Sequence, residues 1–171
     1  MNTATNTLQT TDLTKGKEIL GGIITGQIAG LIMAAVVVIV FTVFLGTAPL
    51  YPVQVIGSMA LGKSALDGFN FAAVLVGVLL HQAGPSLLWG TIFGFAASAM
   101  KIEDTKRSLY LGLVIGVISM VGPYLLIPTL MNAFHGEDFW NQNVPMFWDW
   151  AAHIVFGAAF VLYPKVLAKM K

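Results

Sequence analysis

The stretch Gly77–Gly94, GVLLHQAGPSLLWGTIFG, decides the fold, because it is apolar enough to lie inside a lipid bilayer. A histidine, a glutamine and a proline nevertheless lie near its middle, as His81, Gln82 and Pro85. An ionisable side chain in hydrocarbon is costly, so His81 is a candidate functional residue. Pro85 has no amide hydrogen, and its ring clashes with the carbonyl of His81, so we expect a kink where the chain is already polar.

The whole chain of 171 residues shares this apolar character. Hydrophobic residues make up 57% and charged residues 10% of it, and its mean hydropathy is +0.81. This composition lies outside the range of soluble domains and predicts an all-α integral membrane protein with lipid around it. The net charge of +1, with no basic stripe, gives no support for nucleic-acid binding. The absence of cysteine excludes disulfides, thiolate metal sites and haem attached through cysteine.

Four segments are long and apolar enough to cross a membrane as helices, about 19–47, 70–99, 108–131 and 147–167. They predict a four-helix transmembrane bundle over residues 19–171, built from two helical hairpins. A polar tail over residues 1–18 carries six threonines and too few apolar residues to fold alone. The loop 48–68 contains a short apolar piece that is expected to form an interfacial or re-entrant helix.

Basic residues lie almost entirely on one side of these spans. Of the nine lysines and arginines, only Lys63 falls on the other side; the eight are Lys15, Lys17, Lys101, Lys106, Arg107, Lys165, Lys169 and Lys171. Cytoplasmic loops carry such an excess of positive charge. We therefore expect a multi-pass protein of the bacterial inner membrane with both termini in the cytoplasm.

Small residues recur every four positions on three spans. They are Gly22, Gly26, Gly30 and Ala34 on the first, Gly90 and Gly94 on the second, and Gly112 and Gly116 on the third. Such GxxxG faces let helix backbones approach closely. The spacing is compatible with packing inside the bundle and equally with docking of a partner subunit. The second and fourth spans each carry one histidine flanked by glycine, which predicts a parallel repeat of the two hairpins.

On the fourth span, Asp149 and His153 are four residues apart, so the carboxylate can orient the imidazole. His81 and His153 are the candidate ligands of a b-type haem, and the two with Asp149 are candidates for a metal ion. The alternative is that each histidine only forms hydrogen bonds across the bundle, and we expect no cofactor. His135, in the polar segment HGED, is expected to be solvated.

Large aromatic side chains cluster before and at the start of the fourth span, at Trp140, Phe147, Trp148 and Trp150. This density is typical of the aromatic belt at the depth of the lipid headgroups. A docking face for a partner is the alternative.

Three stretches resemble a loose family of small uncharacterised bacterial four-helix membrane proteins: GGIITGQIAGLIMA, HQAGPSLLWGTIFG and AAHIVFGAAFVLYP. The resemblance covers most of the chain and implies a four-helix membrane fold. Some members carry the label sodium/proline symporter, which implies many more helices than four spans provide, so no activity is carried over from the family.

No catalytic residues are expected, because the chain has no G-x-S-x-G, no H-E-x-x-H, no phosphate loop and no paired intramembrane carboxylates. We therefore expect a non-catalytic accessory subunit of a larger bacterial membrane complex, such as a respiratory or other oxidoreductase complex, with other membrane subunits as partners. A small transporter or channel and an electron-transfer subunit carrying b-haem are the alternatives.

Overall fold

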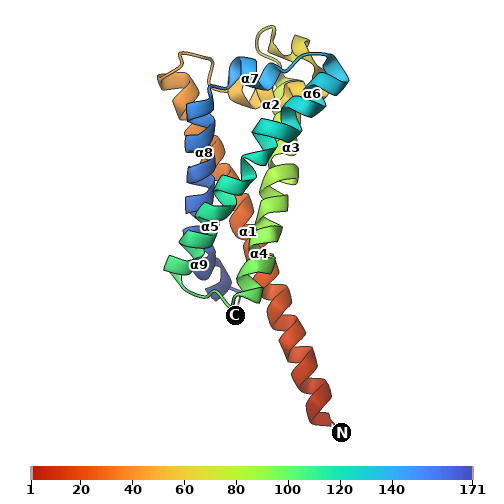
Figure 1. The fold of residues 1–171 in the computed structure, drawn as a ribbon, viewed down its shortest axis with the longest axis vertical. Coiled ribbons are helices and arrows are strands. Elements are labelled where there is room, and N and C mark those ends of the chain that lie inside the picture. Colours follow the sequence, from red (N-terminus) through yellow and green to blue (C-terminus); the bar gives the residue numbers. More distant parts are fainter. Residues whose placement is uncertain (1, 171) are drawn as a thin grey trace.

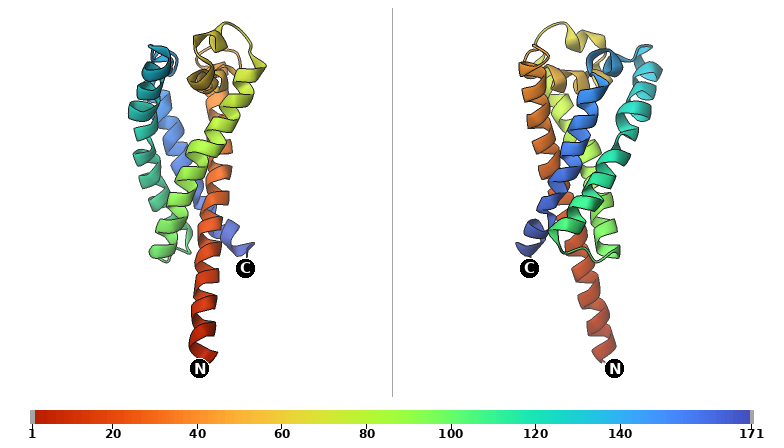
Figure 2. Two further views of the ribbon diagram at one scale, coloured as in Figure 1. Left: turned by 90° about the vertical axis from the view of Figure 1, so that its right-hand side faces the viewer. Right: turned by 60° about the vertical axis from the view of Figure 1, so that its left-hand side comes forward.

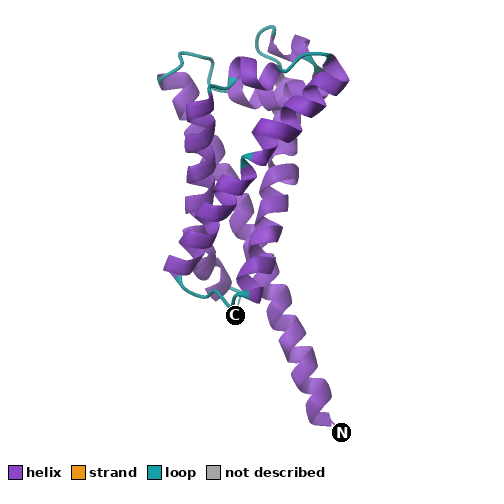
Figure 3. Cartoon of the chain, in the orientation of Figure 1, coloured by secondary structure: helices purple, strands orange, loops and turns teal. Residues whose placement is uncertain are grey.

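The structure is a computed structural model that describes the backbone of residues 2–170 and the side chains of residues 15–170. Four helical segments are long and apolar enough to cross a membrane: Lys15–Val43, Phe71–Ala99, Thr105–His135 and Met146–Ala168. The prediction of an all-α protein with four such helices is thus confirmed, and helices connected by loops account for the described chain (Figure 3). No end of a span lies more than four residues from its expected position.

The first span belongs to α1 (Asn2–Val43), so the stretch expected as a separate polar tail continues the same helix from Asn2 onward. The second span consists of α3 (Phe71–His81), η2 (Gln82–Ser86) and α4 (Leu87–Ala99). The third consists of α5 (Thr105–Ser119), η3 (Gly122–Leu126) and α6 (Ile127–His135), and the fourth of α8 (Met146–Ala159), η4 (Phe160–Leu162) and α9 (Tyr163–Ala168). Two short helices, α2 (Tyr51–Leu61) and α7 (Phe139–Asn143), and one turn of 3₁₀-helix, η1 (Lys63–Leu66), lie in the loops.

The two ends of the bundle differ in what lies there (Figure 1). The α4–α5 connection and the C-terminal part of the chain lie at one end, which we call the terminal end, and the start of α1 projects beyond it. The helices α2 and α7 and the last part of α6 lie at the opposite end, which we call the far end. Figure 2 shows that the second and third spans come together at the terminal end and diverge toward the far end.

A glycine seam joins the two helices of the first hairpin. A Cβ atom added to Gly22 would lie 2.4 Å from the Cα of Gly94, and one added to Gly26 would lie 2.5 Å from the Cα of Gly90. Real Cβ atoms do not approach backbone this closely, so only glycine permits α1 and α4 to pack here. At Gly30 the seam ends against side chains, because the added Cβ would meet Ser86 and Gln82.

A second glycine seam joins the helices of the second hairpin. Cβ atoms added to Gly112 and Gly157 would each meet the other residue's carbonyl oxygen, at 2.2 and 2.5 Å, and one added to Gly116 would lie 2.5 Å from the carbonyl oxygen of His153. Every glycine singled out by its spacing therefore packs against this chain's own backbone or side chains. The glycines in internal contact are Gly22, Gly26, Gly30, Gly90, Gly94, Gly112 and Gly116.

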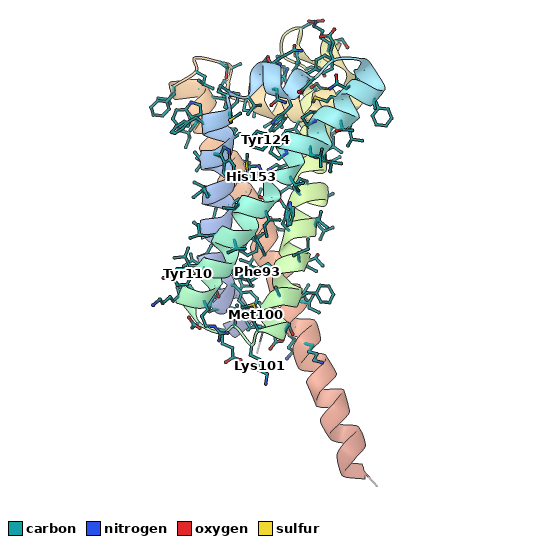
Figure 4. All side chains as sticks on the ribbon, in the orientation of Figure 1. Phe93, Met100, Lys101, Tyr110, Tyr124 and His153 are labelled. Atoms are coloured by element: carbon teal, nitrogen blue, oxygen red, sulfur yellow. The ribbon has the colours of Figure 1, made fainter. Side chains whose placement is uncertain are left out.

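A hydrophobic core fills the terminal half of the bundle between the two seams. Phe93 of the second span stacks on Phe160 with ring centroids 4.2 Å apart, and Tyr163 meets Phe93 edge-on at 5.1 Å. All three side chains are fully buried. Figure 4 places Phe93 near the terminal end, just above Met100. Aromatic contacts thus join the two hairpins where the spans converge.

The helix α2 confirms the helix expected in the loop 48–68 and packs against α3 at the far end. A Cβ atom added to Gly57 of α2 would lie 2.1 Å from the carbonyl oxygen of Ala73, and one added to Gly77 of α3 would lie 2.0 Å from that of Val53. Gln54 is buried, and its amide nitrogen donates to the carbonyls of Ala65 and Gly68, which fixes the following loop on the helix.

Candidate functional site

The second and third spans are both interrupted near their middle by a π-helical turn that contains a proline. Pro85 lies in η2 and Pro123 lies in η3. A π-turn shifts the backbone hydrogen bond to an amide one residue farther along, which accommodates a residue that has no N–H. The amide of Leu87 accordingly donates to the carbonyl of Gln82, and that of Ile127 to the carbonyl of Gly122.

The π-turn at Pro123 in the third span was not predicted from the sequence, where a kink was expected only at Pro85. A signal for it is present, because the pattern Gly-Pro-x-Leu-Leu occurs at 84–88 and again at 122–126. The two copies lie on neighbouring spans of opposite direction, and not at equivalent positions of the two hairpins. The parallel repeat expected from glycine and histidine spacing therefore does not extend to the interruptions of the helices.

Both π-turns border one large cavity between the second, third and fourth spans. Its volume is about 430 Å³, and its walls are almost entirely apolar. The polar residues in the wall are few, namely His81, Ser86, Ser119 and His153 with the indole groups of Trp89 and Trp140. A cavity of this size, with few polar groups on apolar walls, is the usual form of a small-molecule site.

The first polar cluster on the cavity wall lies at the end of the α1–α4 seam. The side-chain amide of Gln27 donates to the carbonyl oxygen of Gln82 at 3.0 Å. The amide of Gln82 donates in return to the carbonyl oxygen of Gln27 at 3.3 Å and to its side-chain oxygen at 3.2 Å. Gln27 therefore binds the carbonyl of the residue after His81, although proline was expected to free the carbonyl of His81 itself.

His81 belongs to the same cluster. Its Nδ1 lies 3.1 Å from Oε1 of Gln82, which also accepts from Ser86 at 3.2 Å. His81 thus contacts Gln82 on the second span, and Gln82 in turn contacts Gln27 of the first span. Gly84, three residues after His81, borders open space, since nothing lies within 4 Å of an added Cβ.

The second polar cluster lies at the end of the α5–α8 seam. Nδ1 of His153 lies 2.6 Å from Oγ of Ser119, and Nε2 lies 3.5 Å from Oδ1 of Asp149. The indole N–H of Trp140 donates to the other carboxylate oxygen of Asp149 at 3.2 Å. Figure 4 shows His153 in the half of the bundle nearer the far end. The spacing of Asp149 and His153 pointed to their contact, whereas Ser119 and Trp140 were not expected to take part.

The hydroxyl of Ser119 also joins this second cluster to the helix backbone, because it donates to the carbonyl oxygen of Gly116 at 2.7 Å.

Serine, histidine and aspartate are also the residue types of a hydrolytic triad, but the arrangement lacks the requirements of one. Ser119 is 1% exposed and its hydrogen is engaged with the helix backbone. The distance of 3.5 Å between His153 and Asp149 is longer than a hydrogen bond. We therefore interpret the cluster as a hydrogen-bonding network in the cavity wall.

The structure brings His81 and His153 to the same cavity, as a haem with two histidine ligands would require. Both ring nitrogens of His153 face partners, however, so ligation would require Nε2 to leave Asp149. Within the described residues, no group of three or more His, Asp or Glu side chains is arranged to hold a metal ion. Asp149 lines a second, smaller cavity of about 180 Å³, and Ala34 also lies in its wall.

The aromatic residues near the fourth span divide into two groups. Phe147 is 72% and Trp150 37% exposed, while Trp148 is half-buried against Phe44 with ring centroids 5.3 Å apart. Trp140 departs from the belt and borders both cavities, because its indole N–H finds an acceptor in the buried Asp149.

His135 also differs from expectation. It ends α6, is half-buried, and its Nε2 lies 2.9 Å from the carbonyl oxygen of Met59 in α2. An ion pair between Lys63 and Glu137, with 3.0 Å between Nζ and Oε2, lies beside it. These contacts fix the end of the third span to α2.

Comparisons of the chain with protein-family models, with curated proteins and with solved structures found no match.

Proposed function

We propose that the chain is a multi-pass protein of a bacterial inner membrane with both termini in the cytoplasm. The exposed lysines and arginines of the terminal end support this orientation, since among the described residues only Lys63 of these lies at the far end. The chain has no cysteine, so single cysteines can report the topology. In intact cells an impermeant maleimide should label Ser64→Cys, and it should label Lys169→Cys only after permeabilisation. The reverse pattern would invert the proposed orientation.

Within that membrane we propose that it acts as a non-catalytic subunit of a larger complex, such as a respiratory or other oxidoreductase complex. The observation that carries the proposal is a set of phenylalanines that are at least 65% exposed at the far end: Phe44, Phe69, Phe71, Phe134 and Phe147. Aromatic belts favour Trp and Tyr, whose polar groups reach water. Phenyl rings lack such a group and gain more from the core of a protein interface.

Purification in a mild detergent tests the subunit proposal. Partner subunits should accompany the wild-type chain in fixed stoichiometry, and the double variant Phe134→Ala/Phe147→Ala should lose them. Phe95→Ala is the matched control, because Phe95 is 59% exposed within the second span, away from the far end. A wild-type chain that purifies alone and monodisperse would contradict the proposal.

A small transporter is the second candidate, and it is supported by the two π-turns on one cavity. Interrupted helices at the middle of the membrane, which expose backbone next to a cavity, are typical of transporter binding sites. Liposomes containing the wild-type chain should then show a solute flux that His81→Ala reduces. Absence of flux for every ion and small solute tested would contradict this candidate and leave the subunit proposal intact.

A further inference from the structure

We infer that the large cavity is a binding site for a lipid-soluble molecule that carries a phenolic hydroxyl group, which donates to Nε2 of His81. The inference goes beyond the proposed subunit function and does not depend on it. It follows from the hydrogen bonds of His81, from the composition of the cavity wall and from the position of the cavity's opening.

The hydrogen-bonding network fixes which nitrogen of His81 accepts. The amide group of Gln82 must direct its NH₂ toward the carbonyl oxygen of Gln27, so its Oε1 faces His81 and Ser86. An amide oxygen only accepts, so Nδ1 of His81 carries the hydrogen and donates to it. Nε2 of the neutral ring is then left with a lone pair.

That lone pair has no donor within the described part of the chain. The structure gives Nε2 of His81 no hydrogen bond, and no buried side-chain nitrogen or oxygen among the described residues lacks a partner. Nε2 therefore keeps accessible surface, and His81 lines both cavities. A ligand that satisfies it must bring a hydrogen-bond donor, and a neutral hydroxyl is the least costly donor to carry into a membrane.

The rest of the wall selects the body of the ligand. Trp89, Trp140 and Phe156 offer aromatic surfaces, and the other walls are aliphatic apart from the two serines and the second histidine. Aromatic rings prefer offset-stacked or edge-on contacts with other rings. The volume of about 430 Å³ lies within the range of roughly 300–1,000 Å³ that small-molecule sites occupy. A phenol meets the aromatic and the hydrogen-bonding requirement at once.

The opening of the cavity gives the ligand a route from the lipid. Wall residues on both sides of the gap between the second and third spans are exposed: Ala83, Gly84, Pro85 and Leu88 on one side, Val121 and Leu126 on the other. These are the spans that diverge toward the far end (Figure 2). Since both spans cross the membrane, an opening between them faces hydrocarbon, so the ligand must be soluble in lipid.

A pair of brominated biphenyls tests the inference on the purified chain. 4-Bromo-4′-hydroxybiphenyl and its methyl ether have the same rings, and both quench tryptophan, but only the phenol can donate to Nε2. Titration in lipid nanodiscs should show saturable quenching, with the phenol bound about fivefold more tightly, as expected for one net hydrogen bond. Trp89→Phe should reduce the quenching. Equal affinity for the two compounds would overturn the role of His81.

Two variants separate the hydrogen bond from the cavity. His81→Phe should abolish the preference for the phenol and retain binding of the ether. Gly84 lines the cavity, and an added Cβ there meets nothing within 4 Å, so Gly84→Leu should weaken both compounds at least tenfold. Gly16→Leu is the matched control, since an added Cβ there also meets nothing within 4 Å but lies outside the cavity wall. Binding that Gly84→Leu leaves unchanged would overturn the site, even if His81→Phe failed to fold.

Discussion

The terminal half and the far half of this bundle are built from the same helices but are packed in opposite ways. In the terminal half, glycines press backbones together and aromatic rings fill the remaining space between the hairpins. In the far half, two π-turns and the divergence of two spans leave a large cavity bordered by polar clusters. Each polar cluster lies where a glycine seam ends, so close packing stops where polarity begins. Gly84 and Gly122 line the cavity, whereas the seam glycines, and Gly57 and Gly77 between α2 and α3, bring backbones together.

Adding a single methyl group to a seam glycine should produce the largest loss in the free energy of unfolding. In Gly26→Ala and Gly112→Ala the new Cβ meets backbone atoms at 2.5 and 2.2 Å, so two helices must separate. We expect a loss of about 3 kcal/mol or more in the free energy of unfolding. Unfolding by SDS titration in bicelles measures it. A change below about 1 kcal/mol would show that the seams can open at little cost.

Removing the carboxyl group of the second polar cluster should give the next largest loss of stability. Asp149→Ala leaves the indole N–H of Trp140 without its acceptor and removes the carboxyl group beside Nε2 of His153. Buried polar groups left unpaired cost about 1–3 kcal/mol each in stability, and we expect about 2 kcal/mol in total. Asp149→Asn keeps an acceptor for Trp140 and should cost less. Equal losses for the two variants would assign the effect to packing alone.

The glutamine pair should show a smaller effect that is specific to the pair. Gln82→Leu leaves Gln27 without its side-chain partner and should cost about 1 kcal/mol, within the range of hydrogen bonds between membrane helices. Gln27→Leu should cost a similar amount. The double variant should be less destabilised than the sum of the two, because it leaves no amide unpaired. Additive losses in a double-mutant cycle would show that the two side chains act independently.

The smallest change in stability, and one of opposite sign, is expected at the two glycines that line the large cavity. In Gly84→Ala and Gly122→Ala the added Cβ meets nothing within 4 Å. Both positions are helical, and alanine lowers the entropy of the unfolded chain, so stability should rise by about 0.5 kcal/mol. The same unfolding assay applies. A loss comparable to that of Gly26→Ala would mean that the far half is as closely packed as the terminal half.

Much of the fold follows from local properties of the sequence. Hydropathy over a window determines which segments can cross a membrane, so the four spans and the helix in loop 48–68 could be predicted. A repeat of four residues also shows that Gly22, Gly26 and Gly30 share one face of a helix. It does not show which face they meet, because that depends on the arrangement of distant segments.

The parts of the site that escaped prediction depend on contacts between distant elements. Ser119 has an ordinary sequence context, and only packing of α5 on α8 brings it to His153. Trp140 fits an aromatic belt by composition, and only the fold of the loop before α8 directs its indole to Asp149. Pro123 was detectable in principle, but no polar neighbour marked it, whereas His81 and Gln82 marked Pro85.

The placement of the glycine seams has a consequence for biogenesis. Each seam joins two spans that follow one another in the chain, α1 with α4 and α5 with α8, and no seam joins spans of different hairpins. The first hairpin is therefore able to close in the bilayer while the second is still being synthesised, since all the contacts of its seam glycines, Gly22, Gly26, Gly30, Gly90 and Gly94, lie within residues 19–94. The aromatic contacts of Phe93 with Phe160 and Tyr163 require both hairpins, so they can form only after the fourth span has been inserted. The order of synthesis then matches an order of assembly in which backbone contacts within hairpins precede side-chain contacts between them.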